Sequence, residues 1–481
     1  MIASRPTSLI WILGAALYGS VALFLVFNGA TNVDEGFYGL TARAAIGGAL
    51  PYRDFGYTQT PLFPFIHGAV MKVIGFGFIE QRLASGLWAF LTVTVGTAWM
   101  ARRRGGALAC VFAALMITGL QWMYFAHLGK THAFVGLVVL LSVLVVLSDW
   151  SFGRRMLGLS LLGVLAVGCR LPVGPYFLIV WAGLLSREFS ARNLASAVAF
   201  PIVLTLVLLV PFIAAAPRGF WFWALDFHRV SSTLKYWRLG FSDLFVFAPA
   251  LNLMALALAA GILARRVHLK GPLDLLILGL LATFACNVVP KGTYPEYAMP
   301  LVPGLIFVLC LVLGGPLKGK PLAWASVALC LVNLTGMPLL DYSVYRDTRK
   351  AAAFTRQFQG PGFPFVGSAS IVALEAGSPV DPRMLMGSFS CTEAYPDDVA
   401  AKLHLITPAG IASLMADPRC DVFILFHSLN VNFVWSMPGF QAISQASIDR
   451  WKAVLSRDYV LEYGDSNYVV FIRRSLYAQA R

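Results

Sequence analysis

The sequence predicts an α-helical polytopic membrane protein with about eleven transmembrane helices and a small extracytoplasmic α/β domain at its C-terminus. Of the 481 residues, 58% are hydrophobic and only 12% are charged, a balance unlike that of a soluble globular protein with a polar surface. The apolar residues form runs of spanning length separated by polar loops. Beyond about residue 345 the composition changes to turn formers, charges and short β-type runs, which indicates a separate soluble domain.

The first apolar run, 9–27, is long enough to cross a membrane and carries no clear small-residue cleavage site of the kind that ends a signal peptide. We therefore expect it to be the first transmembrane helix. Hydropathy predicts ten further spans, at 83–101, 106–125, 132–148, 156–169, 172–186, 194–215, 243–264, 272–289, 298–314 and 321–340.

Lysine and arginine cluster in every second connection between these helices, which predicts their orientation. Basic loops stay on the cytoplasmic side, so the other loops and the C-terminal region face the periplasmic or extracytoplasmic side of the inner (plasma) membrane. The net charge of +14 follows mostly from the basic loops and indicates no nucleic-acid partner. The cytoplasmic clusters are Arg5, Arg102 with Arg103 and Arg104, Arg154 with Arg155, Arg187 with Arg192, Arg265 with Arg266 and Lys270, and Lys318 with Lys320.

Residues 61–78 test this count because they are almost apolar enough to span. Counting them as a span would place the three arginines at 102–104 outside the cell. Two prolines, His67 and Lys72 also suit a helix that lies in the membrane interface. We therefore interpret 28–82 as one long outer loop with membrane-parallel helices, inside a transmembrane domain that covers 1–340.

The C-terminal region, 345–481, is predicted to form an α/β cap of its own. Short β-type runs predict strands at 371–374, 421–426, 459–463 and 468–473. Thr407 and Pro408 open a predicted helix that ends near Ala416, and Ser447 is expected to cap another that runs to about residue 455. Cys391 and Cys420 both lie in this outer region, where an oxidising environment permits a disulfide, but sequence alone leaves their pairing open.

Two adjacent carboxylates, Asp34 and Glu35, follow the first predicted span. In a chain with few charges, an acidic pair at the outer end of a span is the first candidate for chemistry. Asp34 has an alternative role as the N-cap of a helix from Glu35 to Ile46, which Gly47 and Gly48 would close. Capping and catalysis do not exclude one another.

Several basic residues lie at predicted outer helix ends or in outer loops. Cations at this boundary, facing a carboxylate pair, suit a substrate with a lipid-anchored phosphate. Arg170 and Lys291 have an alternative reading as side chains that snorkel to the interface. The outer cations are Arg53, Lys130, Arg170, Arg229, Lys235, Arg238 and Lys291.

Three stretches carry a family resemblance. They are Asp34-Glu35-Gly-Phe-Tyr38 with the later Pro51-Tyr52-Arg53-Asp54-Phe55, the hairpin Cys169-Arg170-Leu-Pro172, and Lys291-Gly-Thr-Tyr294-Pro-Glu-Tyr297. In order and spacing these resemble the outer loops of GT-C glycosyltransferases. The chain is similar to protein O-mannosyltransferases and to bacterial transferases that move aminoarabinose or other sugars from polyprenyl phosphate.

The resemblance implies a GT-C fold and a hexosyl- or pentosyltransferase. Its donor would be a polyprenyl-phosphate-linked sugar, and its acceptor an extracytoplasmic lipid, polysaccharide or protein. An attacking hydroxyl gives its proton to a carboxylate, expected to be Asp34, with Glu35 orienting it or binding a sugar hydroxyl. Cations and hydroxyls stabilise the leaving phosphate. The expected phosphate group is Lys291, Arg170, Tyr294 and Tyr297, and the other substrate-binding candidates are Tyr38, Arg53, Asp54, Lys130, His132 and Arg229.

One departure from the family pattern bears on metal dependence. Many relatives carry a second carboxylate in the next outer loop, but here 127–132 reads His-Leu-Gly-Lys-Thr-His and has no acid. Asp54 could take that role. Asp34, Glu35, Asp54 and His132 could together form a divalent-metal site, but a metal is not required, since no spacing among these residues signals one. The runner-up function is a transporter or flippase of a lipid-linked or anionic substrate, although intramembrane charges and internal repeats, which are typical of transporters, are lacking. A non-catalytic binding protein is the third hypothesis.

Overall fold

The computed structural model describes residues 5–32, 34–231, 271–288, 295–314, 320–334, 342–358, 369–426, 435–437 and 441–480. The predicted span at 243–264 lies outside these ranges. The chain divides into two compact units. Unit 1 comprises 1–29, 85–210 and 236–339, and unit 2 comprises 30–84, 211–235 and 340–481. The domains predicted from sequence, 1–340 and 345–481, stay a prediction. The compact units are divided in another way, with most of the 28–82 loop in the same unit as the C-terminal region.

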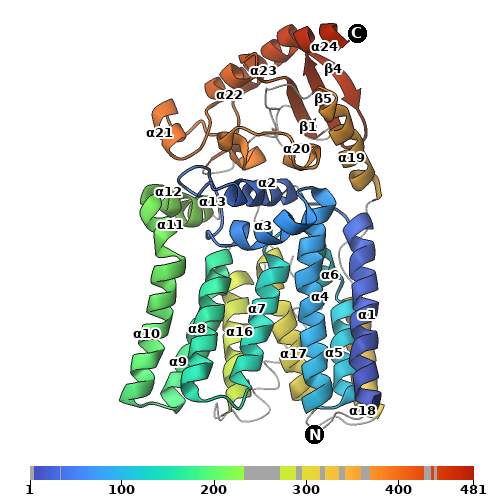
Figure 1. Ribbon diagram of the computed structural model, residues 1–481, viewed down its shortest axis with the longest axis vertical. Helices are drawn as coiled ribbons and strands as arrows, with labels where there is room; N and C mark the ends of the chain where they lie inside the picture. The colour runs from blue at the N-terminus through green and yellow to red at the C-terminus, as the bar shows by residue number, and fades with distance from the viewer. Residues whose placement is uncertain are drawn as a thin grey trace. The chain divides into compact units, whose positions relative to one another are not determined.

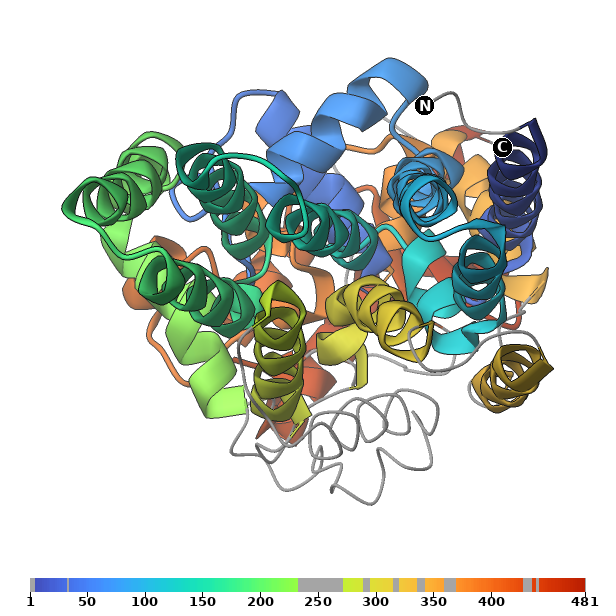
Figure 2. The same cartoon turned by 90° about the horizontal axis from the view of Figure 1, so that it is seen from below.

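Unit 1 is a bundle of helices (Figures 1 and 2). Helix α8 packs against α7 and α10, α9 against α16, and α1 against α5. The described helices of this unit are α1 (Arg5–Asn28), α4 (Phe78–Arg103, of which 78–84 belong to unit 2), α5 (Gly106–Thr118), α6 (Leu120–His127), α7 (His132–Val146), α8 (Phe152–Cys169), η1 (Leu171–Val173), α9 (Gly174–Arg187), α10 (Ala191–Leu208), α16 (Pro272–Val288), η4 (Pro295–Leu301), α17 (Val302–Leu313) and α18 (Lys320–Asn333).

The bundle is that of a multi-pass membrane protein. Five helices among the described residues are long and apolar enough to cross a bilayer, or six if the bent pair α5 and α6 forms one span. Large apolar side chains are exposed along the outside of α1 and α10, for example Leu13, Leu17, Ile202 and Leu206, where lipid satisfies them better than water. The prediction of about eleven spans is not confirmed, because the other apolar helices of the described chain are shorter.

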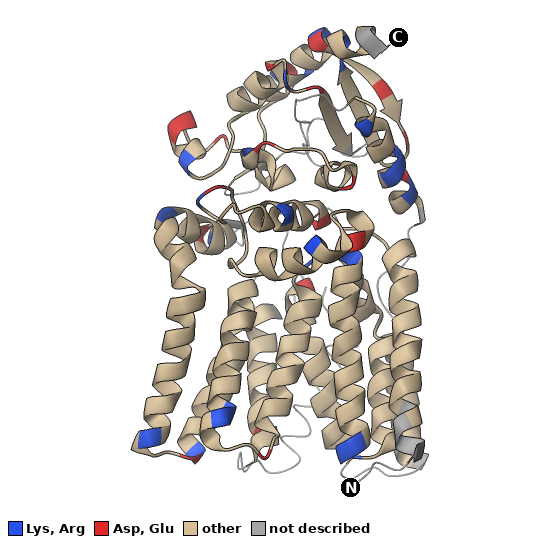
Figure 3. Ribbon diagram, in the orientation of Figure 1, with Lys and Arg blue, Asp and Glu red and all other residues tan. Residues whose placement is uncertain are grey.

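Charges gather at one end of this bundle. The end of α4, the start of α8 and the α9–α10 connection carry their arginines at the end of the bundle where α1 begins (Figures 1 and 3). These are the connections that the positive-inside rule assigns to the cytoplasm. The grouping is the one expected, while the side of the membrane that it faces stays a prediction.

Two predicted spans have different boundaries in the structure. The span predicted at 106–125 is not one continuous helix, since α5 and α6 are separated at Gly119 and bent by 68°. Gly119 has ψ 79°, which leaves the helical region and breaks the hydrogen-bond ladder. Helix α4 begins at Phe78 and not at residue 83. The charge of Arg82 lowers the local hydropathy and moved the predicted start to the next residue. In the fold this charge is neutralised by Glu35, so the helix includes it.

Unit 2 contains the outer loop as two short helices, α2 (Glu35–Ile46) and α3 (Phe63–Ile74). The helix predicted from Glu35 to Ile46 is confirmed. Helix α3 has 12 residues and a length of about 18 Å, which is too short for a bilayer core of about 30 Å. This agrees with the prediction that 61–78 does not span the membrane.

The other helices of unit 2 come from two distant parts of the chain. They are α11 (Val210–Ala215), α12 (Pro217–Trp221), the π-helix η2 (Phe222–Asp226), α13 (Phe227–Ser231), α19 (Tyr342–Arg356), α20 (Ser370–Ala376), η5 (Pro382–Met384), η6 (Gly387–Phe389), α21 (Asp397–Lys402), α22 (Pro408–Ala416), α23 (Gln445–Asp458) and α24 (Arg474–Ala480).

The C-terminal part of unit 2 also holds the strands. Strands β1 (Val422–Phe426), β5 (Tyr468–Arg473) and β4 (Tyr459–Gly464) form an antiparallel sheet in the order β1-β5-β4, and β2 (Trp435–Ser436) pairs with β3 (Gln441–Ala442). The strand predictions at 421–426, 459–463 and 468–473 are thus confirmed. The helix predicted from Pro408 to Ala416 is also present as α22.

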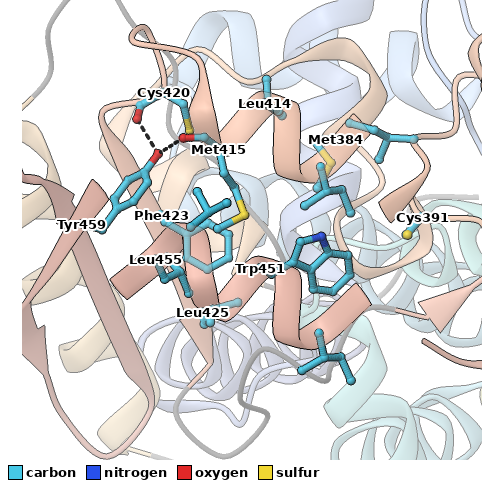
Figure 4. Close-up of a cluster of buried hydrophobic side chains, with 14 of the residues drawn as sticks. Met384, Cys391, Leu414, Met415, Cys420, Phe423, Leu425, Trp451, Leu455 and Tyr459 are labelled. Carbon is cyan, nitrogen blue, oxygen red and sulfur yellow. Dashed lines mark hydrogen bonds between the residues drawn. The ribbon is translucent and has the colours of Figure 1, made fainter. Parts of the chain in front are cut away.

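A hydrophobic core lies beneath this sheet (Figure 4). Trp451 of α23 is buried in it and donates its indole N–H to the Pro408 carbonyl at 2.9 Å. The Tyr459 hydroxyl donates to the carbonyls of Met415 and Cys420 at 2.8 and 2.7 Å, so the polar atoms brought into the core are satisfied. Cys420 and Cys391 are both buried and do not form a disulfide with each other.

Two local predictions in this region are wrong. Residues 371–374 form part of helix α20 and not a strand, because their apolar side chains all pack inside unit 2 and the run lies against the glycines Gly36 and Gly39 of α2. The residue at the N-cap position of α23 is Ser444 and not Ser447, and its side chain makes no capping hydrogen bond. Both serine hydroxyls instead donate to Glu393, at 2.7 and 2.8 Å. Burial raises the pKa of Glu393, but these hydrogen bonds outweigh it and leave the pKa below its usual value.

Candidate functional site

In unit 2, Glu35 forms a fully buried ion pair with Arg82. The Arg82 Nε donates to Oε1 at 2.9 Å and Nη2 donates to Oε2 at 2.7 Å, so the contact is bidentate. Both side chains have 0% exposure. A buried charge pair is tolerated when its geometry is good and its remaining groups are bonded, and this pair meets both conditions.

The surroundings of the pair connect the start of α2 to the start of α4. Arg82 Nη2 donates to the Ala30 carbonyl at 3.1 Å, and its guanidinium lies 4.3 Å from the centroid of the Phe78 ring. The Asn32 N–H donates to Glu35 Oε2 at 3.2 Å. Glu35 therefore fixes the loop that leads into α2.

Asp34 has a different environment although it is the next residue. It is half-buried and stands at the N-cap position of α2 with helical dihedrals, φ −76° and ψ −19°, and its side chain makes no capping hydrogen bond. The alternative role as an N-cap, which needs a side-chain bond to a backbone N–H of the first turn, is therefore wrong. The Asn32 side chain instead receives the Asp34 N–H at 3.0 Å.

The other predicted residues of the first outer loop lie elsewhere in unit 2. The Tyr38 ring is buried and packs edge-on against Tyr57 and Phe63, at 6.3 and 5.7 Å. Arg53 and Asp54 form an exposed ion pair of 2.7 Å. The hydrogen bonds from Arg53 lower the pKa of Asp54, and burial opposes them only in part.

Arg229, from a distant part of the chain, is also in unit 2. It lies 3.3 Å from Asp226, with 79% of its side chain exposed. A surface pair of this kind contributes little to stability.

In unit 1, Lys130 and Arg170 are both buried. Lys130 Nζ lies 2.9 Å from Glu296 Oε2. Arg170 Nη1 donates to Thr131 Oγ1 at 3.1 Å, and its guanidinium lies 5.3 Å from the centroid of the Tyr297 ring. The positive charges of Lys130 and Arg170 both act on the imidazole of His132. We call these residues, Lys130, Thr131, His132, Arg170, Glu296 and Tyr297, the cation centre.

Two side chains of the cation centre, Arg170 and His132, have buried polar atoms without a partner among the described residues. Arg170 is 2% exposed, and its Nε and Nη2 have no hydrogen-bond partner among the described residues. Both ring nitrogens of His132 are likewise buried without a partner in the described part of the chain. An unpaired buried charge is costly, so an anion is the group that would complete this centre.

The structure thus brings together four of the predicted residues in unit 1 and the acidic pair in unit 2. Sequence reasoning missed Arg82 and Glu296, although each had a signal. Arg82 is an arginine at the start of an apolar run, and Glu296 is the acid inside the Pro-Glu-Tyr motif that already singled out Tyr297. Lys291 and Tyr294 lie outside the described residues, as do Lys235 and Arg238.

No group of three or more metal-ligating side chains occurs among the residues that the structure describes. The ligands of the metal site considered from sequence would be Asp34, Glu35, Asp54 and His132. Of these, Glu35 is bound to Arg82 and Asp54 is bound to Arg53.

Comparison with solved structures gives the fold. The chain is similar to ArnT from Cupriavidus metallidurans bound to undecaprenyl phosphate, with a TM-score of 0.69 and 15% identity over 98% of this chain and 99% of that one. The apo state of the same protein gives a TM-score of 0.68 over the same shares and at the same identity. The archaeal oligosaccharyltransferase AglB from Archaeoglobus fulgidus, in complex with an inhibitory peptide and a dolichol-phosphate, gives 0.45 at 10% identity, covering 89% of this chain and 70% of that one.

No protein-family model matches the chain, and no curated protein matches it. At 15% identity the likeness to ArnT concerns the fold. The chain therefore has the fold of ArnT, which agrees with the fold that the resemblance of its outer loops implies.

Proposed function

We propose that the chain is an integral-membrane glycosyltransferase that moves a sugar from a polyprenyl-phosphate donor to a hydroxyl of an extracytoplasmic acceptor. The observation that carries the proposal is Arg170, a buried cation with two N–H groups that lack partners among the described residues. The fold supports it, since the solved structure of similar fold was obtained with undecaprenyl phosphate bound.

The cation centre would bind the donor's phosphate. A guanidinium presents paired N–H groups in the geometry of two phosphate oxygens. Arg170 has such groups at Nε and Nη2, while its Nη1 donates to Thr131. The nearby charge of Lys130 adds electrostatic stabilisation as the leaving phosphate gains charge. Tyr297 packs against Arg170 and restricts the guanidinium. Lys291 and Tyr294 keep their predicted place in this group.

Asp34 would act as the base. The acceptor oxygen attacks the anomeric carbon, the bond from that carbon to the phosphate oxygen breaks, and the hydroxyl proton passes to the Asp34 carboxylate. The phosphate leaves with the bonding electron pair, and a single displacement inverts the anomeric configuration. Glu35 is unsuited to the same task because both of its oxygens accept from Arg82; it would position Asp34 instead.

The remaining predicted contacts, Tyr38, Arg53, Asp54, His132 and Arg229, are proposed to line the substrate path. The buried ring of Tyr38 would act through packing, while the exposed Arg53 and Asp54 would meet the soluble acceptor. The acceptor side is proposed to be the periplasmic or extracytoplasmic face, opposite the basic end of the bundle.

The test compares cells that lack the protein with cells complemented by the intact chain, by Asp34→Asn or by Glu80→Gln. Envelope lipids and glycoconjugates are measured by mass spectrometry. We expect a glycan that is missing without the protein and restored by the intact chain and by Glu80→Gln, but not by Asp34→Asn. Glu80→Gln is the matched control because it removes an acid from the same unit, in the first turn of α4, to which no substrate contact is assigned.

Binding separates donor recognition from chemistry. Purified intact chain and Asp34→Asn should bind undecaprenyl phosphate equally well, and Arg170→Gln should bind it at least tenfold more weakly. Full restoration of the glycan by Asp34→Asn would end the assignment of the base. Movement of a lipid-linked sugar across the membrane without a new glycan would instead favour the flippase hypothesis.

A further inference from the structure

The cation centre contains one acid, Glu296, and this acid already occupies Lys130. The Lys130 side chain is 1% exposed, whereas Glu296 exposes 17% of its side chain. Lys130 is therefore held in place by packing, and the carboxylate is the partner that has room to leave. Glu296 lies in the first turn of η4, a 3₁₀-helix, and its departure needs no movement of Lys130.

The charges of the centre leave a role for this acid. Lys130 and Arg170 bring two positive charges to one place, because Arg170 bonds to Thr131, which lies between Lys130 and His132. Glu296 neutralises one of these charges while the site holds no substrate. An arriving phosphate would satisfy the unpartnered N–H groups of Arg170 and would compete with Glu296 for Lys130. A carboxylate and a phosphate oxygen make the same kind of charge-assisted contact with an ammonium group.

We propose that Glu296 is a resident counter-ion that the donor phosphate displaces from Lys130, and that its return drives release of the product phosphate. The proposal rests on the proposed function and deepens it. The donor is a phosphodiester with one negative charge. The product, a polyprenyl monophosphate, carries between one and two charges at pH 7, as a phosphorylated side chain does.

This difference in charge lets Glu296 distinguish the product from the donor. Its negative charge repels the product more strongly than the donor, because the product has the larger charge at the same position. Glu296 therefore weakens product binding and speeds turnover. A merely structural ion pair would have the opposite signature, since its loss would loosen the site and weaken binding of every ligand.

The experiment measures equilibrium binding of undecaprenyl phosphate to the purified full chain in nanodiscs, at pH 7 and fixed salt. Glu296→Gln keeps the shape of the side chain and removes its charge, and we expect it to bind the probe on the order of tenfold more tightly than the intact chain. In Lys130→Gln/Glu296→Gln this gain should vanish, because the carboxylate acts through Lys130. Inhibition of turnover by added undecaprenyl phosphate should strengthen in Glu296→Gln by a similar factor.

A second variant covers the case in which Glu296→Gln fails to fold. Glu296→Asp keeps the charge but withdraws the carboxylate from Lys130 by one methylene, and it should bind the probe a few-fold more tightly. Unchanged or weaker binding by the folded variants would overturn the role of Glu296. That failure is distinct from failure of the proposed function, in which the intact chain does not bind undecaprenyl phosphate at all and Arg170→Gln makes no difference.

Discussion

The buried pair of Glu35 and Arg82 gives the sharpest prediction. Glu35→Gln removes a charge while keeping the side-chain volume, and it leaves the Arg82 guanidinium with 0% exposure opposite a neutral amide. Removing one partner of a buried ion pair destabilises a protein by about 3–5 kcal/mol. The amide oxygen and the Ala30 carbonyl still accept from Arg82, so we expect the lower end, about 3 kcal/mol.

Hydrogen–deuterium exchange of the full chain in nanodiscs measures this locally. A loss of about 3 kcal/mol raises the open population roughly 100-fold, and the amides of α2 should exchange faster by that factor if the segment opens as one unit. The matched control is Asp54→Asn, which breaks an exposed pair in the same unit. Its effect should stay below about 1 kcal/mol.

The charge argument fails on either of two results. One is an exchange rate in Glu35→Gln no faster than in Asp54→Asn. The other is a double variant, Glu35→Gln/Arg82→Met, that is as unstable as Glu35→Gln, because removing the second charge relieves the unpaired guanidinium and should recover part of the loss.

Three further changes test unit 2 and one helix of unit 1. Gly36→Ala places a Cβ in a steric clash with the Ser370 hydroxyl of α20. The variant should destabilise α20 by about 1–3 kcal/mol, seen as faster proteolysis of 369–377. Gly153→Ala, whose Cβ meets no atom beyond its own stretch of helix, should not. Tyr459→Phe should cost only about 1 kcal/mol by exchange of α22 amides, because Arg473 also donates to both carbonyls. The pKa of Glu393 is lowered in the fold. The stability that its carboxylate adds is therefore present above its ordinary pKa of about 4.3 and is lost as the pH falls further. Amide hydrogen exchange of α23 should differ between the intact chain and Glu393→Gln at pH 6, and the two rates should converge below about pH 4.

Hydropathy and capping rules predicted much of the fold because those signals are local. The helix from Glu35 to Ile46 and strands β4 and β5 follow from short-range patterns and are present as expected. Residues 371–374 were misjudged because a short apolar run suits a strand or a buried helix equally well. What decides between them is the close approach of α20 to Gly36, more than 300 residues earlier in the chain.

The candidate site was predictable only in part for the same reason. Lys130 and Arg170 stood out as charges at apolar helix ends, but their partners depend on contacts across the chain. In the local sequence, the charge of Arg82 indicates the end of a span. Its neutralisation by Glu35, 47 residues earlier, cannot be seen from the local pattern. Glu296 lies 166 residues from Lys130, and no local pattern links the two.

The acidic pair that stood out in the sequence is divided by its structure. Successive helical residues point about 100° apart, so Glu35 turns into unit 2 toward Arg82 while Asp34 stays half-buried at the start of α2.

If Glu35 acts only by holding the start of α2 in place, the loss of Glu35 can be compensated. Turnover lost in Glu35→Gln should recover in part in Glu35→Gln/Arg82→Met, measured as transfer from a polyprenyl-phosphate-linked sugar, because the double variant removes the uncompensated charge that distorts the loop. No second change near Arg82 should restore Asp34→Asn, since a missing base is a missing proton acceptor. Recovery of both, or of neither, would contradict this division of roles.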